Sequence, residues 1–179
     1  YVEEGGVIDK EAFKRATSVY LVDRVVPMLP EELSNNLCSL KPNVDRLAYS
    51  VFFEMKENGD LVNYKIKKSI IHSDYRFTYE NAQNILKTKV GVFKKELFLL
   101  NSIAKKLRVS RLKKGSINFK SSDIKFVFDD LGNPVDVFFK TPIETNHLIE
   151  EFMLLANKTV SKHINSIKKK PLPFVYRVH

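Results

Sequence analysis

The chain has 179 residues, 44% of them hydrophobic, which suffices for one folded domain with a core and excludes a largely disordered chain. Its formal net charge of +9 favours polyanionic partners, because Lys and Arg that neutralise phosphates release condensed counterions. Charge by itself does not separate RNA from DNA or from an acidic membrane, but no apolar run approaches the roughly 20 residues that cross a bilayer, which excludes a membrane span.

The first quarter of the chain is predicted to hold one short helix and then an ordered loop. Asp9 is expected to cap a helix around residues 8–13 by accepting backbone N–H bonds. Pro27, Pro30 and Pro42 each remove an amide donor and fix φ, so this stretch is predicted to lack long regular structure. Its apolar content is too high for a solvated linker, so we expect it to pack across the domain or to line a cleft.

A β-hairpin and a short helix are predicted next. Two β-rich runs between Ala48 and Ser73 flank residues 57–60, where the Asn58-Gly59 pair supplies the positive φ that a tight turn demands. A short helix is expected to open at Thr78 and to run to about Leu86.

A long amphipathic helix is predicted to follow and to end near residues 113–115. Apolar side chains recur there at spacings of three and four, and the opposite face is rich in Lys. The residues expected on the buried face are Phe93, Leu97, Leu100, Ile103, Ala104 and Leu107.

A second hairpin and a last helix complete the predicted order. Residues 123–128 and 135–140 are expected to pair across a turn at 129–134. Thr145 or Asn146 is expected to cap a helix that runs to about Ile167. Hairpins in place of βαβ crossovers predict an α+β fold, with antiparallel hairpins packed against amphipathic helices. The apolar side chains expected to be buried on the last helix are Leu148, Ile149, Phe152, Leu155, Ala156 and Val160.

No nucleophile or zinc site is evident from residue spacing. The histidines lack zinc-type spacing with a Cys or carboxylate partner, so each is interpreted as a surface or locally hydrogen-bonded residue. Cys38 has no obvious His base and is interpreted as a small core residue; as the only cysteine it excludes an internal disulfide, and we expect a reducing, cytoplasmic location. The four histidines are His72, His147, His163 and His179.

Basic residues dominate between Lys87 and Lys125. They form either a phosphate-contacting face or an ordinary solvated helix face, and the charge pattern does not decide between the two. Glu150 and Glu151 read as an exposed acidic pair, with Glu150 at the border of the buried stripe, where a carboxylate can point into a cleft. The basic residues of the long helix are Lys105, Lys106, Arg108, Arg111, Lys113 and Lys114.

Several longer blocks follow one another in a specific order. The first are RATSVYL at 15–21, PMLPEELSN at 27–35 and LCSL at 37–40. The others are DRL at 45–47, RFTYE at 76–80 with Gln83, GSINF at 115–119 and LIEEFMLLAN at 148–157. Together they resemble the catalytic (RNB) domain of the ribonuclease II/R family, ribonuclease R being the closer branch, and they cover nearly the whole chain.

The resemblance implies a processive hydrolase that degrades single-stranded RNA from its 3′ end to nucleoside 5′-monophosphates. It also implies Mg²⁺ ions held by an aspartate cluster in the full-length parent. In the family that cluster lies upstream of the segment that begins here with Tyr1, and an arginine near the scissile phosphate lies downstream of His179. We therefore expect residues 1–179 to be one internal segment of the domain, with no metal ligands and no catalytic residues of its own.

Four residues match the family's substrate-holding positions. By resemblance, Tyr20 and Phe119 would clamp stacked bases, and Tyr79 and Glu150 would contact the terminal nucleotide and its ribose. Without the resemblance, each aromatic reads as a core or cleft-wall residue. Two alternatives stay open: a non-catalytic RNA-binding module, and a structural or protein-interaction domain whose charge only keeps it soluble. A domain cut within a sheet would also expose strand edges, so we expect self-association.

Overall fold

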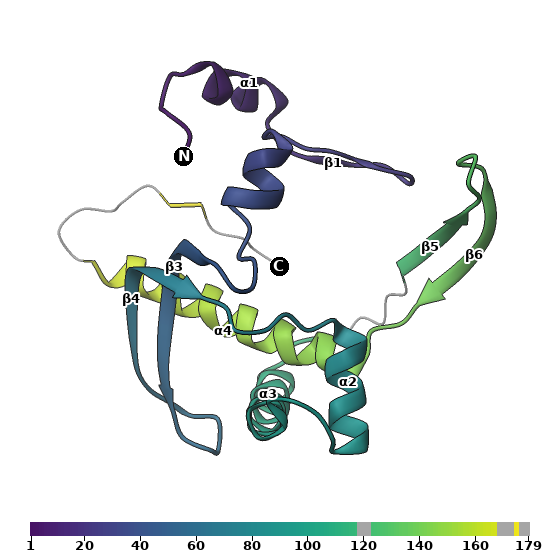
Figure 1. Ribbon diagram of the computed structural model, residues 1–179. Helices are drawn as coiled ribbons and strands as arrows, with labels where there is room; N and C mark the ends of the chain where they lie inside the picture. Colours follow the sequence, from purple (N-terminus) through teal and green to yellow (C-terminus); the bar gives the residue numbers. More distant parts are fainter. Residues whose placement is uncertain (118–122, 168–173, 176–179) are drawn as a thin grey trace. The chain divides into compact units, whose positions relative to one another are not determined.

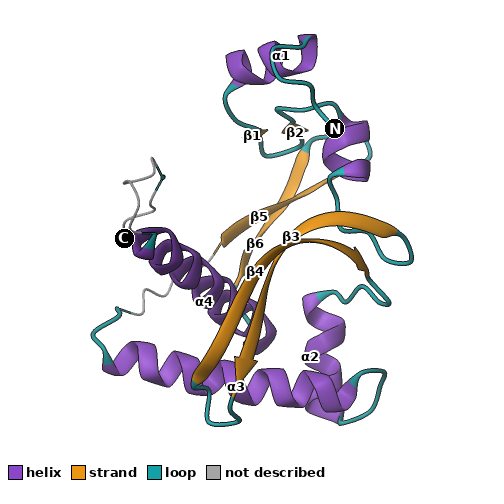
Figure 2. Ribbon diagram, turned by 90° about the vertical axis from the view of Figure 1, so that its left-hand side faces the viewer, coloured by secondary structure: helices purple, strands orange, loops and turns teal. Residues whose placement is uncertain are grey.

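The computed structural model describes residues 1–117, 123–167 and 174–175. The chain divides into two units, and the hairpin formed by β3 (Asp45–Met55) and β4 (Leu61–His72) contributes to both. Unit 1 comprises Tyr1–Ala48, Lys68–Arg76 and Ser121–Thr141, and unit 2 comprises Tyr49–Lys67, Phe77–Lys120 and Pro142–His179. Helices and antiparallel hairpins are mixed, as Figures 1 and 2 show, so the predicted α+β class is confirmed.

Unit 1 begins with α1 (Val7–Arg15), followed by β1 (Val19–Tyr20) paired antiparallel with β2 (Val25–Val26). The predicted cap at Asp9 is wrong, because the helix starts two residues earlier and its N-cap is Gly6. Asp9 instead lies in the first turn, where its carboxylate accepts a 2.8 Å hydrogen bond from the Gly5 amide. An acidic side chain there also interacts favourably with the positive end of the helix dipole.

The proline-rich stretch is more regular than predicted. A π-helix covers Glu32–Leu37, so the expectation of a loop is wrong there. Of the apolar side chains in the proline-rich stretch, only Leu33 is buried. Residues 27–31 do line a cavity of about 380 Å³ together with residues of α1. Arg15 Nη1 of α1 donates a hydrogen bond to the Pro27 carbonyl at 3.0 Å and so connects the helix to this segment. Val25, Val26, Leu37 and Leu40 are exposed instead.

Both predicted hairpins are confirmed. Gly59 has φ +90° in the β3–β4 turn, and its amide donates to the Lys56 carbonyl at 2.9 Å. β5 (Asp123–Phe128) pairs with β6 (Pro134–Lys140), and the Asp129 carboxylate closes their turn by accepting the amides of Leu131 and Asn133 at 3.0 and 2.7 Å. These local hydrogen bonds explain why the turn sequences alone were sufficient for the prediction.

The core of unit 2 is formed by α2 (Tyr79–Thr88) and α3 (Lys94–Lys113), which Figure 2 shows close together. Thr78 caps α2 by accepting the Asn81 amide at 3.1 Å, as its position predicted. Gly91 lies between the two helices with φ +139°, and a Cβ there would lie 2.6 Å from Ile85 Cγ1, so the packing requires glycine. The buried cluster consists of Ala82, Ile85, Leu86 and Leu97, with Phe77 packed against it.

The last helix, α4 (Glu144–Ser166), differs from its prediction in its cap and in its buried face. Its N-cap is Ile143; Asn146 lies in the first turn and accepts the Ile143 amide at 2.9 Å, and Thr145 is buried. Leu148 is buried as predicted, but Ile149 is exposed, and the other four predicted residues are half-buried. The remaining buried side chains of α4 are polar: Thr145 bonds to α2, Glu151 bonds to α3, and Thr159 bonds within α4. In the part of the chain that the structure describes, no helix has the length and apolarity to span a membrane.

Candidate nucleic-acid interface

Three of the four residues assigned by resemblance lie within the described part of the chain. Tyr79 is the first residue of α2 and Glu150 lies on α4, both in unit 2, and both are partly exposed. Tyr20 ends β1 in unit 1 and is 79% exposed, which excludes a core role for this side chain within the described residues. Phe119 lies outside the described residues.

Buried polar side chains fix Tyr79 to α4. Thr145 Oγ1 donates to the Tyr79 carbonyl at 2.9 Å, and the Thr145 amide donates to Gln83 Oε1 at 3.2 Å. Thr145 and Gln83 are 3% and 9% exposed, so these bonds are shielded from competing water. The start of α2 is therefore held against the first turn of α4, the helix that carries Glu150.

Glu150 is held by three cationic or polar groups. Its Oε1 lies 3.3 Å from Arg111 Nη2, and its Oε2 lies 3.6 Å from Arg108 Nη1 and 3.0 Å from His147 Nδ1. The carboxylate is 45% exposed, so it remains accessible while its orientation is restricted.

Glu151, one residue further along α4, is buried and was not predicted to be. Its carboxylate receives Arg111 through Nη2 at 2.6 Å and through Nε at 3.2 Å to both oxygens. This hydrogen bond raises the pKa of the Arg111 guanidinium, against the opposing effect of burial. The expectation of an exposed acidic pair is therefore confirmed for Glu150 and wrong for Glu151. The only feature of the sequence that pointed to the Arg111–Glu151 pair was the opposite charge on two amphipathic helices. Opposite charge does not specify which residues pair.

The basic residues of α3 fall into two groups. Arg108 and Arg111 have side chains only 19% and 16% exposed, and both pair with the glutamates of α4, so they are not part of a free phosphate-contacting face. Lys105 pairs with Glu144, whose pKa is lowered chiefly by the Asn101 side-chain hydrogen bond and then by the one from Lys105. The exposed lysines Lys106, Lys113 and Lys114 have no carboxylate partner among the described residues.

The surroundings of the histidines and of Cys38 agree with the predictions in part. His72 Nδ1 lies 2.7 Å from Asp45 Oδ1, and His163 Nδ1 lies 3.2 Å from Tyr64 Oη, so both are locally hydrogen-bonded as expected. His179 lies outside the described residues. Cys38 is exposed, so its interpretation as a core residue is wrong.

The residues present do not fit the metal ions that the resemblance implies. Within the described ranges, no three His, Cys, Asp or Glu side chains are grouped closely enough to hold a metal ion. The carboxylates of Glu150 and Glu151 are already paired with Arg108 and Arg111. No step of a hydrolysis reaction can therefore be assigned to a metal on these residues.

Antiparallel hairpins, a three-helix cluster and the order of the sequence blocks together define the class of this domain. The model of the RNB domain matches residues 1–179, so the chain belongs to the RNB domain family. It is 39% identical to ribonuclease R 2 of Lactococcus lactis and 40% identical to ribonuclease R of Thermotoga maritima, in each case over all of this chain. The chain spans only 28% and 26% of the length of these two relatives.

A solved structure shows the same likeness. The chain resembles Mycoplasma genitalium RNase R, determined in complex with ribose methylated single-stranded RNA, with a TM-score of 0.86 and 29% sequence identity. The match covers 94% of this chain and 27% of that one.

Proposed function

We propose that this chain is the part of a 3′-to-5′ exoribonuclease that forms the wall of the RNA channel and holds the 3′ end of single-stranded RNA. The observation that carries the proposal is the RNB domain match over residues 1–179, with ribonuclease R proteins near 40% identity. The likeness to an RNase R bound to single-stranded RNA supports the choice of substrate. We extend the proposal to the products, nucleoside 5′-monophosphates, to processive action, and to a cytoplasmic location.

The proposed contacts follow from the chemistry of the side chains. Tyr20 and Phe119 supply flat π-faces that stack on any base, each worth roughly 1 to 3 kcal/mol. Tyr79 and Glu150 supply partners for the terminal nucleotide, and a carboxylate oxygen of Glu150 can accept a hydrogen bond from the ribose 2′-OH, which DNA lacks.

The ion pairs around Glu150 support this role. A carboxylate near the RNA backbone would repel phosphates if its charge were uncompensated. Glu150 and Glu151 carry two negative charges and Arg108 and Arg111 carry two positive ones, so the cluster is neutral in sum. Glu150 can therefore accept a hydrogen bond from the substrate with little net repulsion.

We propose that catalysis in the full-length protein requires Mg²⁺ bound by carboxylates outside residues 1–179. Such ions activate water and stabilise the departing oxygen in phosphodiester hydrolysis. The residues of this chain bind and orient RNA, and by itself the chain does not shorten it. The alternative is a non-catalytic RNA-binding module, which would bind RNA without shortening it even as the full-length protein supplied with Mg²⁺.

The test is a fluorescence titration of this chain with a single-stranded oligoribonucleotide and with a copy that carries 2′-deoxyribose in its last two nucleotides. We expect the ribose form to bind about 3- to 10-fold more tightly, the equivalent of one hydrogen bond. Glu150→Gln should reduce that preference, whereas Glu96→Gln, an exposed carboxylate on α3, should not. Equal affinity for both oligonucleotides would overturn the assigned role of Glu150, and no RNA affinity at all would favour the structural-domain alternative.

A further inference from the structure

We infer that the exposed lysines at the C-terminal half of α3 form a second RNA contact, which binds the phosphodiester backbone independently of the 3′-end contacts. The inference rests on the proposed function, since it assumes an RNA partner. It adds a site that binds through charge alone, which Tyr20, Tyr79 and Glu150 do not line.

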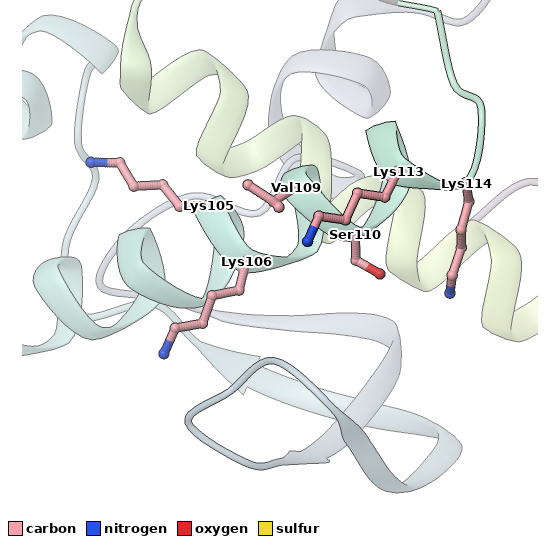
Figure 3. A pocket seen from close by; sticks show the side chains of 6 residues that line it. All are labelled: Lys105, Lys106, Val109, Ser110, Lys113 and Lys114. Atoms are coloured by element: carbon pink, nitrogen blue, oxygen red, sulfur yellow. The ribbon is translucent and has the colours of Figure 1, made fainter.

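The site is an open groove of about 510 Å³ along α3, shown in Figure 3. Of the six described residues that line it, four are lysines and none is acidic. The Lys106 and Lys113 side chains and the Ser110 hydroxyl extend to the same side of the helix in this view. The lining residues are Lys105, Lys106, Val109, Ser110, Lys113 and Lys114.

Lys106, Lys113 and Lys114 take no part in the described ion pairs of α4, whereas Lys105 pairs with Glu144. The Lys106 ammonium donates to the Glu57 carbonyl at 2.5 Å, a contact that orients the side chain without neutralising it. The β3–β4 turn can approach so closely because Gly59 lies opposite: a Cβ on Gly59 would lie 3.3 Å from Lys106 Cβ. Lys113 and Lys114 have no carboxylate partner within the described ranges, so their charge is available to a ligand.

The spacing of the lysines suits a strand of phosphates. Lys106 and Lys113 are seven residues apart, about 10 Å along a helix that rises 1.5 Å per residue. A stacked nucleic-acid strand places one phosphate about every 3.4 Å, so this distance covers about three phosphates. The Ser110 hydroxyl between them can donate to a phosphate oxygen.

The described residues of the groove lack the groups that would favour a nucleobase or a membrane as its ligand. Among the described residues that line it, none is aromatic for stacking and none is Asn, Gln or Arg for bidentate base contacts, so these residues do not distinguish sequence or RNA from DNA. Of the described residues that line the groove, only Val109 is apolar, so the groove itself offers charge and a hydroxyl, with little apolar surface for insertion into a membrane. The observations therefore favour a nucleic-acid backbone.

The test compares Lys113→Gln/Lys114→Gln with the native chain in binding a 20-nucleotide RNA and a 5-nucleotide RNA across a salt series. We expect the slope of log affinity against log salt for the long RNA to fall by about 0.7 per lost contact, hence by about 1.4 in total. The short RNA, which the 3′-end contacts alone can hold, should bind almost unchanged, and a 20-nucleotide DNA should lose affinity as the long RNA does.

Two matched variants make the result specific. Lys94→Gln/Lys95→Gln removes the same charge from adjacent exposed lysines at the other end of α3, about 28 Å away along the helix, and should alter binding much less. Lys113→Arg/Lys114→Arg keeps the charge and should retain the native slope. A melting temperature within a few degrees of native for every variant would exclude unfolding as the cause.

Four outcomes would overturn the inference. Equal effects of the two glutamine double variants would show general electrostatic attraction without a localised site. If the native chain binds both RNAs and Lys113→Gln/Lys114→Gln binds them with the same affinities, the groove is not an RNA contact. That result would leave the proposed function standing. A native chain that binds neither RNA would refute both the groove and the proposed function. If Lys113→Gln/Lys114→Gln lost affinity only for anionic lipid vesicles, tested in parallel, the lysines would belong to a membrane-binding surface.

Discussion

Arg111 on α3 and Glu151 on α4 form an ion pair in which three nitrogen–oxygen contacts of 2.6 to 3.2 Å join a guanidinium to a carboxylate that is 3% exposed. The pair lies in the interface between the two helices, where the apolar spacing of both helices predicted hydrophobic contacts. Removing one member of a buried pair leaves the other charge uncompensated, which is why such pairs are costly to break.

Arg111→Met is therefore expected to lower the free energy of unfolding by about 3 kcal/mol, the low end for breaking a buried pair, because Arg108 still lies 3.7 Å from Glu151. The measurement is urea denaturation followed by circular dichroism. Lys158→Met, at an exposed position of α4, is the control and should change stability by less than about 0.5 kcal/mol. A loss of under 1 kcal/mol for Arg111→Met would mean that the pair does not hold the helices together.

Two buried threonines of α4 provide a matched comparison. Thr145 Oγ1 donates to the Tyr79 carbonyl of α2, whereas Thr159 Oγ1 donates to the Leu155 carbonyl of its own helix. Thr145→Val leaves a shielded carbonyl at the start of α2 without its donor, so we expect it to cost about 1 to 3 kcal/mol. Thr159→Val should cost less, since a side-chain bond within one turn adds little to a formed helix. Equal losses in thermal denaturation would contradict the assigned tie between α2 and α4.

Glu144 is predicted to make stability depend on pH in the acid range. Hydrogen bonds from Asn101 and Lys105 lower its pKa in the folded chain below the ordinary value of 4.5. Its contribution is therefore fully present above pH 4.5 and is lost as pH falls through the lower folded-state pKa. The urea midpoint of Glu144→Gln should fall less steeply than that of the native chain between pH 5 and about pH 3. Parallel curves for the two proteins would show that this carboxylate is not linked to folding.

Self-association is expected through the β5–β6 hairpin. All described side chains of β6 are exposed, and Ile124 and Phe139 pair across the two strands with 54% and 68% exposure. Exposed strand edges with apolar side chains favour pairing with another copy. The apparent mass from light scattering should rise with concentration for the native chain and much less for Ile124→Lys/Phe139→Lys. Leu131→Lys changes an exposed apolar residue in the turn and should leave the association intact; a monomer at all concentrations would refute the expectation.

Local sequence accounts for much of the secondary structure. Asn58-Gly59 and residues 129–134 specified the turns of both hairpins, and Thr78 specified the start of α2, because each acts through hydrogen bonds or φ values within a few residues. The other capping predictions failed by a few residues: Asp9 lies in the first turn of α1, and Thr145 and Asn146 lie in the first turn of α4. The Thr145 side chain instead donates a hydrogen bond to α2, at Tyr79, which lies 66 residues earlier in the chain.

The sequence by itself determined the α+β class and the order and approximate bounds of the main helices and hairpins, because these depend on periodicity and turn chemistry. The RNA contacts of Tyr20, Tyr79, Phe119 and Glu150, taken from the resemblance of ordered blocks, stay predictions. Only the tertiary structure decided how the charges are used. The basic run of α3 looked uniform, yet Arg108 and Arg111 are committed to the glutamates of α4 while Lys113 and Lys114 remain exposed. The reason is physical: the Coulomb energy and the desolvation of a charge depend on distance and burial, and residues about 40 positions apart acquire both only when the helices pack.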